Sequence, residues 1–369
     1  MKVLVTGGAG FIGGYVVDML LGRGHEVVVL DNLEKPTHSG IPDYLPKEVK
    51  FIRGDVRNRK DVLKSLSGVE VVLHQAATGG FTPSITEYID SNSLGTANLL
   101  ELIVAKNIPV KKFIVASSIA VYGEGKYRCR KHGIVYPPVR PEKQLMRREW
   151  EMKCPECGLN LVPLQTDEEK PVSPETIYSV SKYDEERISL IIGRKYGIPT
   201  VALRYFVTYG PRQSLLNPYT GVCSIFSTRI LNGKPPVIFE DGMQTRDFVY
   251  VKDVAKANML AMNKSKADYN VYNVGTGRGV PIIHIAEKLI KAYGKSLKPH
   301  LSGEFRPGEV RHMVADISRI KKLGFKPEYD FDRGIEEYVK WIKKRGGIRE
   351  YFSAAERILR KSRTIVKAR

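Results

Sequence analysis

The chain has 369 residues, of which 42% are hydrophobic and 27% are charged, so it can bury a sizeable core and is not a disordered polymer. No run approaches the roughly 18 apolar residues of a membrane span, and four cysteines are too few for a disulfide framework. The net charge of +19 raises nucleic acid as a partner, but much of the excess lies in residues 343–369. The chain enters a strand pattern directly, with no signal-peptide cleavage site. We therefore predict a cytoplasmic protein with no membrane partner and no main role in binding nucleic acid.

Short runs rich in valine and isoleucine alternate with helix-length segments along the first half of the chain. The predicted strands are 2–6, 26–30, 49–52, 69–74, 112–116 and 200–205, and the predicted helices are 12–23, 60–66, 85–106 and 175–196. Continuous apolar runs are typical of strands buried on both faces, and their alternation with helices predicts right-handed crossovers. The predicted fold class is α/β, with a Rossmann-type, doubly wound parallel sheet.

The composition changes twice along the chain. After about Gly210 the sequence is dominated by loops rich in glycine, proline and asparagine, which predict a smaller C-terminal substrate lobe. A segment before it is rich in proline, arginine and lysine and holds three of the four cysteines. The predicted organisation is an NAD-binding Rossmann domain (1–125 and 173–210), a small metal-binding insertion (126–172), the substrate lobe (211–345) and a basic C-terminal helical tail (346–369).

A glycine-rich loop joins the first predicted strand to the first predicted helix. Gly7, Gly10 and Gly13 fit G-x-x-G-x-x-G, and Gly8, Gly10 and Gly13 also fit the dinucleotide fingerprint. Glycine is needed because the backbone must turn tightly and approach a pyrophosphate, which the helix N-terminus then binds through free N–H groups. Asp31 closes the second strand, where a carboxylate accepts hydrogen bonds from ribose hydroxyls and repels a 2′-phosphate. The loop therefore predicts that the chain binds NAD rather than NADP. The alternative interpretation of the loop is a glycine turn with a purely structural role.

Tyr178 and Lys182 are four residues apart on a predicted helix and so share a face. Such a pair usually lies on a solvated surface, but Ser117 and Ser118 end the fifth strand, where α/β sheets bind ligands. A tyrosine with a pKa near 10 is a poor base at neutral pH, and a neighbouring ammonium group would stabilise its phenolate. We predict that Tyr178 accepts a proton and that Ser118 orients the same substrate oxygen.

The motifs together resemble the extended short-chain dehydrogenase/reductases, of the nucleotide-sugar epimerase kind typified by UDP-glucose 4-epimerase. The resemblance covers nearly the whole chain except 126–172 and the tail. In the first part of the chain it is carried by the glycine loop, Gly54-Asp55-Val56-Arg57, His74-Gln75-Ala76-Ala77, Asn92 with Gly95-Thr96, Ser117-Ser118-x-x-Val121-Tyr122-Gly123, and Tyr178 with Lys182. In the second part it is carried by Gly210-Pro211-Arg212-Gln213, Asn217-Pro218-Tyr219-Thr220-Gly221-Val222, Arg246-Asp247 and Arg306-Pro307-Gly308-Glu309.

The resemblance implies a site residue by residue. Catalysis would rest on Ser118, Tyr178 and Lys182. The residues implied to contact NAD are Gly7, Gly10, Phe11, Ile12, Gly13, Asp31, Asn32, Asp55, Val56, Gln75, Ala76, Ala77, Asn92, Ser117, Tyr178, Lys182 and Tyr205. Those implied to contact a nucleotide-diphosphate sugar are Ser118, Val207, Arg212, Asn217, Arg246 and Arg306. Arg246 and Arg306 would bind the diphosphate, since a planar guanidinium pairs with phosphate in bidentate fashion. Val207 stands where the family often has asparagine, and Gln75 where an aliphatic residue is commoner.

The residues after Ser118 discriminate between the reactions of this family. Ile119 and Ala120 cannot move a proton, whereas dehydratases and decarboxylases of the family carry acidic side chains there. The resemblance therefore implies an NAD-dependent nucleotide-sugar 4-epimerase of the UDP-glucose/UDP-galactose type, which oxidises and re-reduces sugar C4 with tightly bound NAD. The family also implies a homodimer in which helices 85–106 and 175–196 pair across a two-fold axis. A dTDP-6-deoxyhexose (rhamnose-type) 4-epimerase and, in a different class, a non-catalytic NAD- or RNA-binding protein are the alternatives.

The segment 126–172 contains two short metal-ligand pairs. Cys129 and His132 form one, and Cys154 and Cys157 form the other after 21 intervening residues. The pattern resembles a zinc ribbon with a Cys₃His tetrahedron. Four protein ligands leave no open position for catalysis, so we predict a structural Zn²⁺ that folds this segment. Redox-labile cysteine pairs or free thiols are the alternatives, and an insertion of this kind is one reason for keeping the rhamnose-type hypothesis open.

Overall fold

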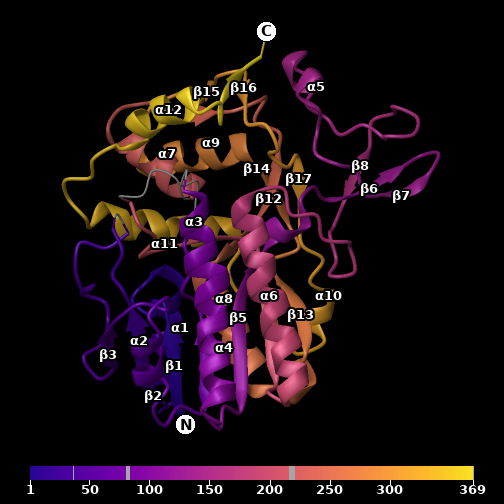
Figure 1. The fold of residues 1–369 in the computed structure, drawn as a ribbon. Helices are drawn as coiled ribbons and strands as arrows, with labels where there is room; N and C mark the ends of the chain where they lie inside the picture. Colours follow the sequence, from indigo (N-terminus) through magenta and orange to yellow (C-terminus); the bar gives the residue numbers. More distant parts are fainter. Residues whose placement is uncertain (36, 80–83, 216–220, 369) are drawn as a thin grey trace.

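The computed structural model describes residues 1–35, 37–79, 84–215 and 221–368. Within them the largest sheet has seven parallel strands in the order β13-β9-β5-β4-β1-β2-β3 (Figure 1). Its strands are β1 (Lys2–Thr6), β2 (Glu26–Asp31), β3 (Lys50–Arg53), β4 (Val71–His74), β5 (Lys112–Ser118), β9 (Thr200–Tyr205) and β13 (Asn270–Val274). This arrangement confirms the predicted Rossmann-type parallel sheet.

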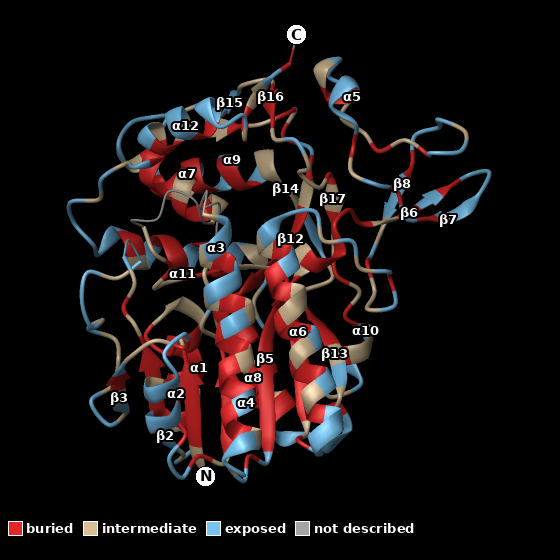
Figure 2. Ribbon diagram, viewed as in Figure 1, coloured by how far each residue is buried: buried red, intermediate tan, exposed pale blue. Residues whose placement is uncertain are grey.

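Helices cover both faces of the large sheet. One face packs on α1 (Phe11–Leu21) and α8 (Val251–Asn263), and the other on α2 (Arg59–Ser65), α4 (Gly95–Ala105) and α6 (Ile177–Tyr196). Alternate residues of a strand point to opposite faces, so Val3 and Val5 of β1 join the first layer and Leu4 joins the second. The inner strands β1, β5 and β9 are accordingly almost wholly buried (Figure 2), whereas the edge strand β3 has only Ile52 buried.

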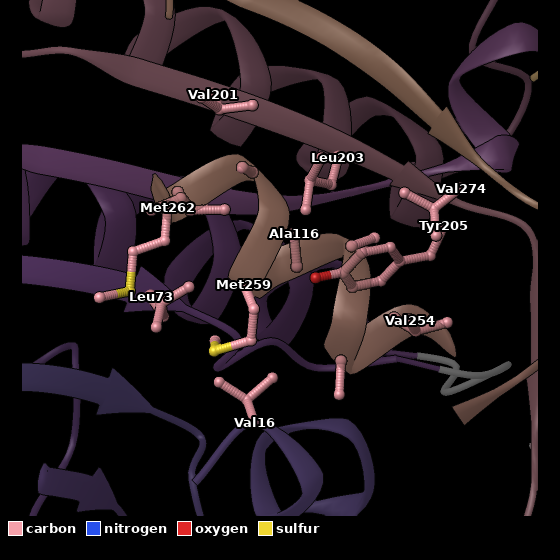
Figure 3. Packing of buried hydrophobic residues seen from close by; sticks show 14 of the residues in the cluster. Val16, Leu73, Ala116, Val201, Leu203, Tyr205, Val254, Met259, Met262 and Val274 are labelled. Atoms are coloured by element: carbon pink, nitrogen blue, oxygen red, sulfur yellow. The ribbon is translucent and has the colours of Figure 1, made fainter. Parts of the chain in front are cut away.

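The core between the sheet and α8 is a close packing of branched and flexible apolar side chains. Figure 3 shows Val254, Met259 and Met262 of α8 against Leu73, Ala116, Val201, Leu203 and Tyr205 of the sheet, with Val16 of α1 beside them. Residues within the stretch predicted as the substrate lobe, 211–345, therefore complete the large sheet and its helical layer. The predicted boundary at Gly210 is corrected in this respect, because β13 pairs with β9 over its full length.

The predicted helix 85–106 is three consecutive segments in the structure. They are α3 (Ile85–Tyr88), a π-helical turn (Ile89–Leu94) and α4. A π turn inserts one residue into the helical repeat and re-aims the side chains on it, which is frequent at functional sites. Here it carries the buried Asn92.

The second lobe packs three helices around a small mixed sheet. The sheet contains β10 (Val207–Tyr209), β12 (Thr245–Tyr250), β14 (Gly279–Pro281) and β17 (His312–Met313). The helices are α7 (Val222–Leu231), α9 (Ile282–Tyr293) and α11 (Phe331–Lys343), and the core between these elements is rich in aromatic residues. Shorter elements are β11 (Val237–Ile238) paired with β15 (His300–Leu301), α10 (Ser318–Lys321), and the 3₁₀ turns Ile119–Tyr122 and Ser265–Ala267.

The insertion forms a three-stranded antiparallel sheet in the order β7-β6-β8, with one short helix. Its elements are β6 (Lys126–Cys129), β7 (Gly133–Val135), α5 (Glu142–Met146) and β8 (Val162–Leu164). Figure 1 shows these strands projecting beside the second lobe. The tail contributes α12 (Phe352–Lys361) and β18 (Val366–Lys367), and β18 pairs with β16 (Glu304–Phe305).

Candidate active site

A cavity of about 1060 Å³ lies between the carboxyl ends of the large sheet and the second lobe. Its wall includes the glycine loop, the ends of β2, β5 and β9, the start of α6, and loops of the second lobe and the tail. The carboxyl ends of parallel strands are where open α/β sheets bind ligands. The residues predicted to contact cofactor or substrate therefore come together here, apart from the exceptions described below.

The glycine loop packs too closely for larger residues. Gly7 has a φ of +67°, and a Cβ on Gly13 would lie 2.1 Å from the carbonyl oxygen of Gly7. The loop also brings the N-terminus of α1 to the cavity, where Gly7, Gly10, Phe11, Ile12 and Gly13 all lie in the wall. Free N–H groups at such a helix end favour a phosphate.

Asp31 closes β2 beside this loop and is fixed in orientation. Its Oδ2 accepts a hydrogen bond from the Ala9 N–H at 3.0 Å, and its Oδ1 accepts one from the Leu33 N–H at 2.9 Å. The remaining lone pairs of the carboxylate can accept hydrogen bonds from the two ribose hydroxyls of an adenosine. The geometry fits the predicted dinucleotide.

Asp55 and Val56 form the neighbouring part of the wall. The Asp55 carboxylate accepts hydrogen bonds from Asn32 Nδ2 at 2.9 Å and from Arg57 Nη2 at 2.6 Å. Burial opposes ionisation, but the Arg57 guanidinium outweighs it and lowers the pKa of Asp55 to about 2. Val56 packs on Gly95, where a Cβ would lie 2.6 Å from Val56 Cγ2. The predicted adenine end is thus a fixed carboxylate beside an apolar side chain.

Gln75 has a structural partner that the sequence did not reveal. Its Nε2 donates to Asn258 Oδ1 at 3.0 Å, and its Oε1 accepts from the Tyr205 hydroxyl at 3.0 Å. Asn258 Nδ2 donates to Tyr205 Oη at 2.7 Å and closes the ring of contacts. Gln75, Ala76, Ala77 and Tyr205 all line the cavity, and Asn258 of α8 holds two of them.

Asn92 lies behind the cavity wall, so the predicted contact with the cofactor is not what the structure shows. Its Nδ2 donates to Ser181 Oγ at 2.9 Å and to the Thr78 carbonyl at 3.1 Å, and its Oδ1 accepts from the Thr78 N–H at 2.8 Å. Fully buried, it links the loop after β4 to α6. The hydroxyl of Ser117 is likewise engaged, since it donates to Glu186 Oε2 at 2.7 Å, although Ser117 lies in the wall.

The predicted catalytic residues lie on two adjoining elements. Thr176 and Ser179 cap each other's backbone N–H groups, so α6 begins at Ile177 and presents Tyr178 to the cavity from its first turn. The Tyr178 ring packs on Tyr88, with ring centroids 5.9 Å apart. Ser118 Oγ accepts the Ala120 N–H at 3.1 Å, which leaves its own proton available to a substrate oxygen.

Lys182 is almost fully buried and has an acidic neighbour. Its Nζ donates to Glu185 Oε2 at 2.7 Å. Burial raises the pKa of Glu185 to about 7, against the opposing effect of the Lys182 ammonium. Glu185 was not predicted from the sequence, although its i,i+3 spacing from Lys182 was a signal.

His74 is a buried link rather than a proton carrier. Its Nδ1 lies 2.6 Å from Thr6 Oγ1 and its Nε2 lies 2.9 Å from Thr96 Oγ1. Burial, with the Lys182 charge, lowers the pKa of His74 to about 3, so the ring is neutral. Thr6 Oγ1 in turn accepts the Ala76 N–H at 3.2 Å, which fixes the loop facing the glycines.

The two predicted diphosphate arginines meet at one carboxylate. Arg246 Nη2 lies 2.9 Å from Glu309 Oε1, and Arg306 Nη1 lies 3.6 Å from Glu309 Oε2. Burial would raise the pKa of Glu309, but Arg306 and Arg246 reverse this and lower it. Both arginines line the cavity, together with Val207. Two guanidinium groups against one carboxylate leave a net positive charge in this part of the wall, and positive charge favours a diphosphate.

Arg212 lines the cavity as well. Its guanidinium is packed between the Tyr15 and Tyr44 rings and pairs with Asp18 of α1 at 2.7 Å. These contacts fix its position in the wall, and its contact with substrate stays a prediction. Asn217, the remaining predicted substrate contact, lies outside the described residues.

The four predicted metal ligands come together in the insertion, away from the cavity. The donor atoms of Cys129, His132, Cys154 and Cys157 all lie within 4.8 Å of one another. The Cys129 and Cys157 sulfurs are 3.6 Å apart, and His132 Nδ1 lies 3.3 Å from Cys154 Sγ. Zn–S bonds of about 2.3 Å in a tetrahedron put sulfurs about 3.8 Å apart, so the donor set fits zinc.

The sequence matches the NAD dependent epimerase/dehydratase family over residues 3–144 and 159–275. The chain belongs to this family. The gap between the two matched segments, residues 145–158, lies within the insertion. Within the described residues, no helix is long and apolar enough to cross a bilayer.

Individual relatives cover almost the whole chain. The dTDP-L-rhamnose 4-epimerase of Burkholderia thailandensis is 34% identical over 92% of this chain and 94% of its own length. The putative UDP-glucose 4-epimerase of Methanocaldococcus jannaschii is 35% identical over 92% and 98%. Among solved structures, UDP-glucose 4-epimerase of Thermotoga maritima with UDP-glucose has a TM-score of 0.76 at 31% identity, covering 93% of this chain and 99% of that one. UDP-glucuronic acid 4-epimerase of Bacillus cereus with NAD has a TM-score of 0.74 at 30% identity, with the same coverages.

Proposed function

We propose that this protein is an NAD-dependent nucleotide-sugar 4-epimerase of the UDP-glucose/UDP-galactose type. The observation that carries the proposal is one cavity lined by the glycine loop and Asp31, by Ser118 with Tyr178, and by Arg306. This combination suits a dinucleotide, a sugar and a diphosphate bound in the same cavity. The 4-epimerase names of the relatives support the same reaction.

The chain's own residues supply the acid–base chemistry. Tyr178 takes the proton of the sugar C4 hydroxyl and later returns it, while Ser118 donates a hydrogen bond to the same oxygen. Lys182 lowers the cost of the Tyr178 phenolate by placing a buried ammonium one helical turn away. NAD, when bound, supplies a reversible hydride acceptor. Arg246 and Arg306 bind the diphosphate, so the sugar can turn while the nucleotide stays in place.

The direct test follows C4 inversion by NMR with a panel of UDP- and dTDP-hexoses and no added cofactor. Tyr178→Phe should lower kcat by about 10²–10⁴-fold, the usual effect of removing an acid–base group. Tyr196→Phe, at the exposed end of the same helix, is the matched control and should behave as wild type. Full inversion by Tyr178→Phe would exclude the mechanism.

A dTDP-6-deoxyhexose of the rhamnose type is the second candidate substrate. The relative from Burkholderia thailandensis favours it, and so does the cysteine-bearing insertion. The same panel decides between the two, because the preferred substrate is the one with the higher kcat/KM.

For the insertion we propose a structural Zn²⁺ held by Cys129, His132, Cys154 and Cys157. The mutual distances of the four donor atoms support it, as does the small apolar core around them. Elemental analysis should find one zinc per chain, and Cys154→Ser should lose it; the buried Cys223→Ser is the control. Metal-free protein with an ordered insertion would overturn the proposal. A zinc–thiolate site needs reduced cysteines, which favours the cytoplasm.

We also propose a homodimer through the helices on one face of the large sheet. Exposed apolar side chains on the π turn and α6 support this surface, namely Ile89, Leu94, Val180 and Ile191. An isolated soluble surface seldom gathers so many. Light scattering should give twice the chain mass, and Ile191→Asp should give monomer, whereas Ile134→Asp in the insertion should not.

A further inference from the structure

The C-terminal tail borders the same cavity as the catalytic residues. Ile358, Leu359, Ser362 and Thr364 line it, next to Arg306 and Pro307 of the second lobe. Ile358 is about half exposed although it is apolar. Neither the family resemblance nor the matched segments of the family extend to these residues.

The tail is docked and not free. Phe305 pairs with Val366 in the short antiparallel ladder of β16 and β18, immediately before Arg306. Arg360 pairs with Glu304 of β16 and, at 2.9 Å, with Glu356. These contacts hold the end of α12 beside the loop that carries the diphosphate arginine.

The insertion holds both the tail and that loop. Leu145 of α5 packs in one small cluster with Phe305 and Ala368. Arg140 donates to the Glu309 carbonyl at 3.0 Å and pairs with Glu240 at 2.8 Å, with both side chains almost fully buried. The loop between β16 and β17 is therefore fixed from two sides, by the tail and by the insertion.

The pairing of Phe305 with Val366 places the tail beside the loop that carries Arg306, and this position indicates what the tail contacts. If the sugar lies at Tyr178 and the diphosphate at Arg306 and Arg246, the group beyond the diphosphate is the nucleoside. Ile358 offers an apolar surface to a planar base. Ser362 Oγ donates to the Leu359 carbonyl at 3.2 Å and lies 2.9 Å from Thr364 Oγ1, so the two hydroxyls can accept hydrogen bonds from the base edge or the ribose. An exposed apolar side chain and two hydroxyls beside an arginine suit a nucleoside diphosphate.

We propose that the C-terminal tail is the nucleoside-binding wall of the substrate site and that the insertion positions this wall. The proposal rests on the proposed function, because it places the sugar at Tyr178. It makes Ile358 and Thr364 binding residues for the nucleotide and Leu145 a positioning residue.

The test measures UDP and dTDP binding to the NAD-loaded protein by calorimetry. Ile358→Ala and Thr364→Val should each weaken binding of the preferred nucleotide by about three- to tenfold, with bound NAD unchanged. Ile134→Ala deletes the same side chain from an equally exposed position in the insertion and should bind as wild type. Leu145→Ala, which removes no cavity atom, should weaken binding to a similar degree.

The outcomes separate the two proposals. Wild-type protein that binds neither UDP nor dTDP would overturn the proposed function. Wild-type protein that binds one of them, with unchanged affinity in Ile358→Ala and Thr364→Val, would overturn the nucleoside wall alone. Unchanged affinity in a folded Leu145→Ala would overturn the positioning role of the insertion. If Leu145→Ala loses the insertion fold, Arg140→Lys replaces it as the test variant, because lysine keeps the charge but not the forked guanidinium. Wild-type nucleotide affinity in Arg140→Lys would also overturn the positioning role of the insertion.

Discussion

Beneath the tyrosine and lysine of the active site lies a carboxyl group that titrates near neutral pH. Glu185 is fully buried, 2.7 Å from Lys182 Nζ, and burial raises its pKa to about 7. Below that pH Lys182 acts on Tyr178 with its full charge. Above it the Glu185 carboxylate cancels part of that charge, while His74 stays neutral throughout. The net charge of this buried pair therefore changes near neutral pH, one helical turn from Tyr178.

Glu185→Gln keeps the shape of the side chain and removes its charge. We expect kcat of the wild type to fall relative to the variant as pH rises through about 7, because only the wild type then places a carboxylate beside Lys182. The pKa of Glu185 is raised from 4.5 to about 7 on folding. Its contribution to the free energy of unfolding is therefore complete below pH 4.5 and is lost as pH rises through 7. The variant should therefore be more stable than wild type at pH 8, and the difference should shrink at pH 4.

Asp184→Asn is the matched comparison, because Asp184 binds Ser93 at 2.8 Å and not Lys182, and its charge raises the pKa of Glu185 less than burial does. It should leave the pH profile of kcat nearly unchanged. Identical profiles in wild type and Glu185→Gln would show that Glu185 does not modulate Tyr178.

Short-range spacing explains which site residues the sequence identified. Tyr178 and Lys182 share a helical face and Ser118 ends a strand, so local pattern alone places them at the cavity. Asn258 was not predictable, because it is 183 residues from the Gln75 that it holds. The neighbours of Arg212 were not predictable for the same reason, since only the folded chain brings Tyr15 and Tyr44 around its guanidinium.

At the scale of elements, the glycine loop is the piece whose conformation depends most on single residues. Gly13→Ala would place a Cβ 2.1 Å from the Gly7 carbonyl oxygen, so the loop must shift away from the N-terminus of α1. We expect about 1–3 kcal/mol lower stability and loss of most of the bound NAD. Chemical denaturation and quantification of released NAD measure the two effects.

Gly40→Ala serves as the comparison for that change. In the described part of the chain, a Cβ on Gly40 would meet no heavy atom within 4 Å beyond its own chain neighbours, and Gly40 is not in the left-handed region. It should keep wild-type stability and NAD content. A Gly13→Ala protein with full NAD content would mean that the loop tolerates the shift and does not set cofactor affinity.

Elements were predictable where their pattern is local. The structure places β1 and β9 at the predicted bounds, 2–6 and 200–205, because both are continuous apolar runs. The helix 85–106 was predicted without its π turn, since periodicity does not reveal the contacts of Asn92 with Thr78 and Ser181 that accompany the turn. Strand β13 was missed because only its pairing with β9 assigns it to the large sheet.

At the scale of the whole molecule, a buried ion cluster joins the insertion to the second lobe. The side chain of Arg311 is fully buried and pairs with Asp241 at 2.7 Å, Glu240 at 3.0 Å and Glu151 at 2.6 Å. Arg140 shares Glu240. These partners are 70 to 160 positions from Arg311 in the sequence, so the sequence alone could not pair them. The cluster gives the insertion a fixed place beside the substrate loop.

The cluster predicts how stability depends on Arg311 and on acid. Arg311→Met would take this partner from the partly exposed Asp241 and Glu151 and leave the buried Glu240 with Arg140 alone, so we expect a loss of about 2–3 kcal/mol at pH 7 by chemical denaturation. His312 and Arg311 hold the pKa of Glu151 near 2, against burial; its contribution is present above pH 4.5 and is lost as pH falls toward 2. The free energy of unfolding of the wild type should therefore fall more on acidification over that range than that of Arg311→Met.

Arg147→Met is the control, because it breaks an exposed ion pair of the same insertion. It should lower the free energy of unfolding by less than about 1 kcal/mol. An equally small loss in Arg311→Met would refute the structural role of the cluster.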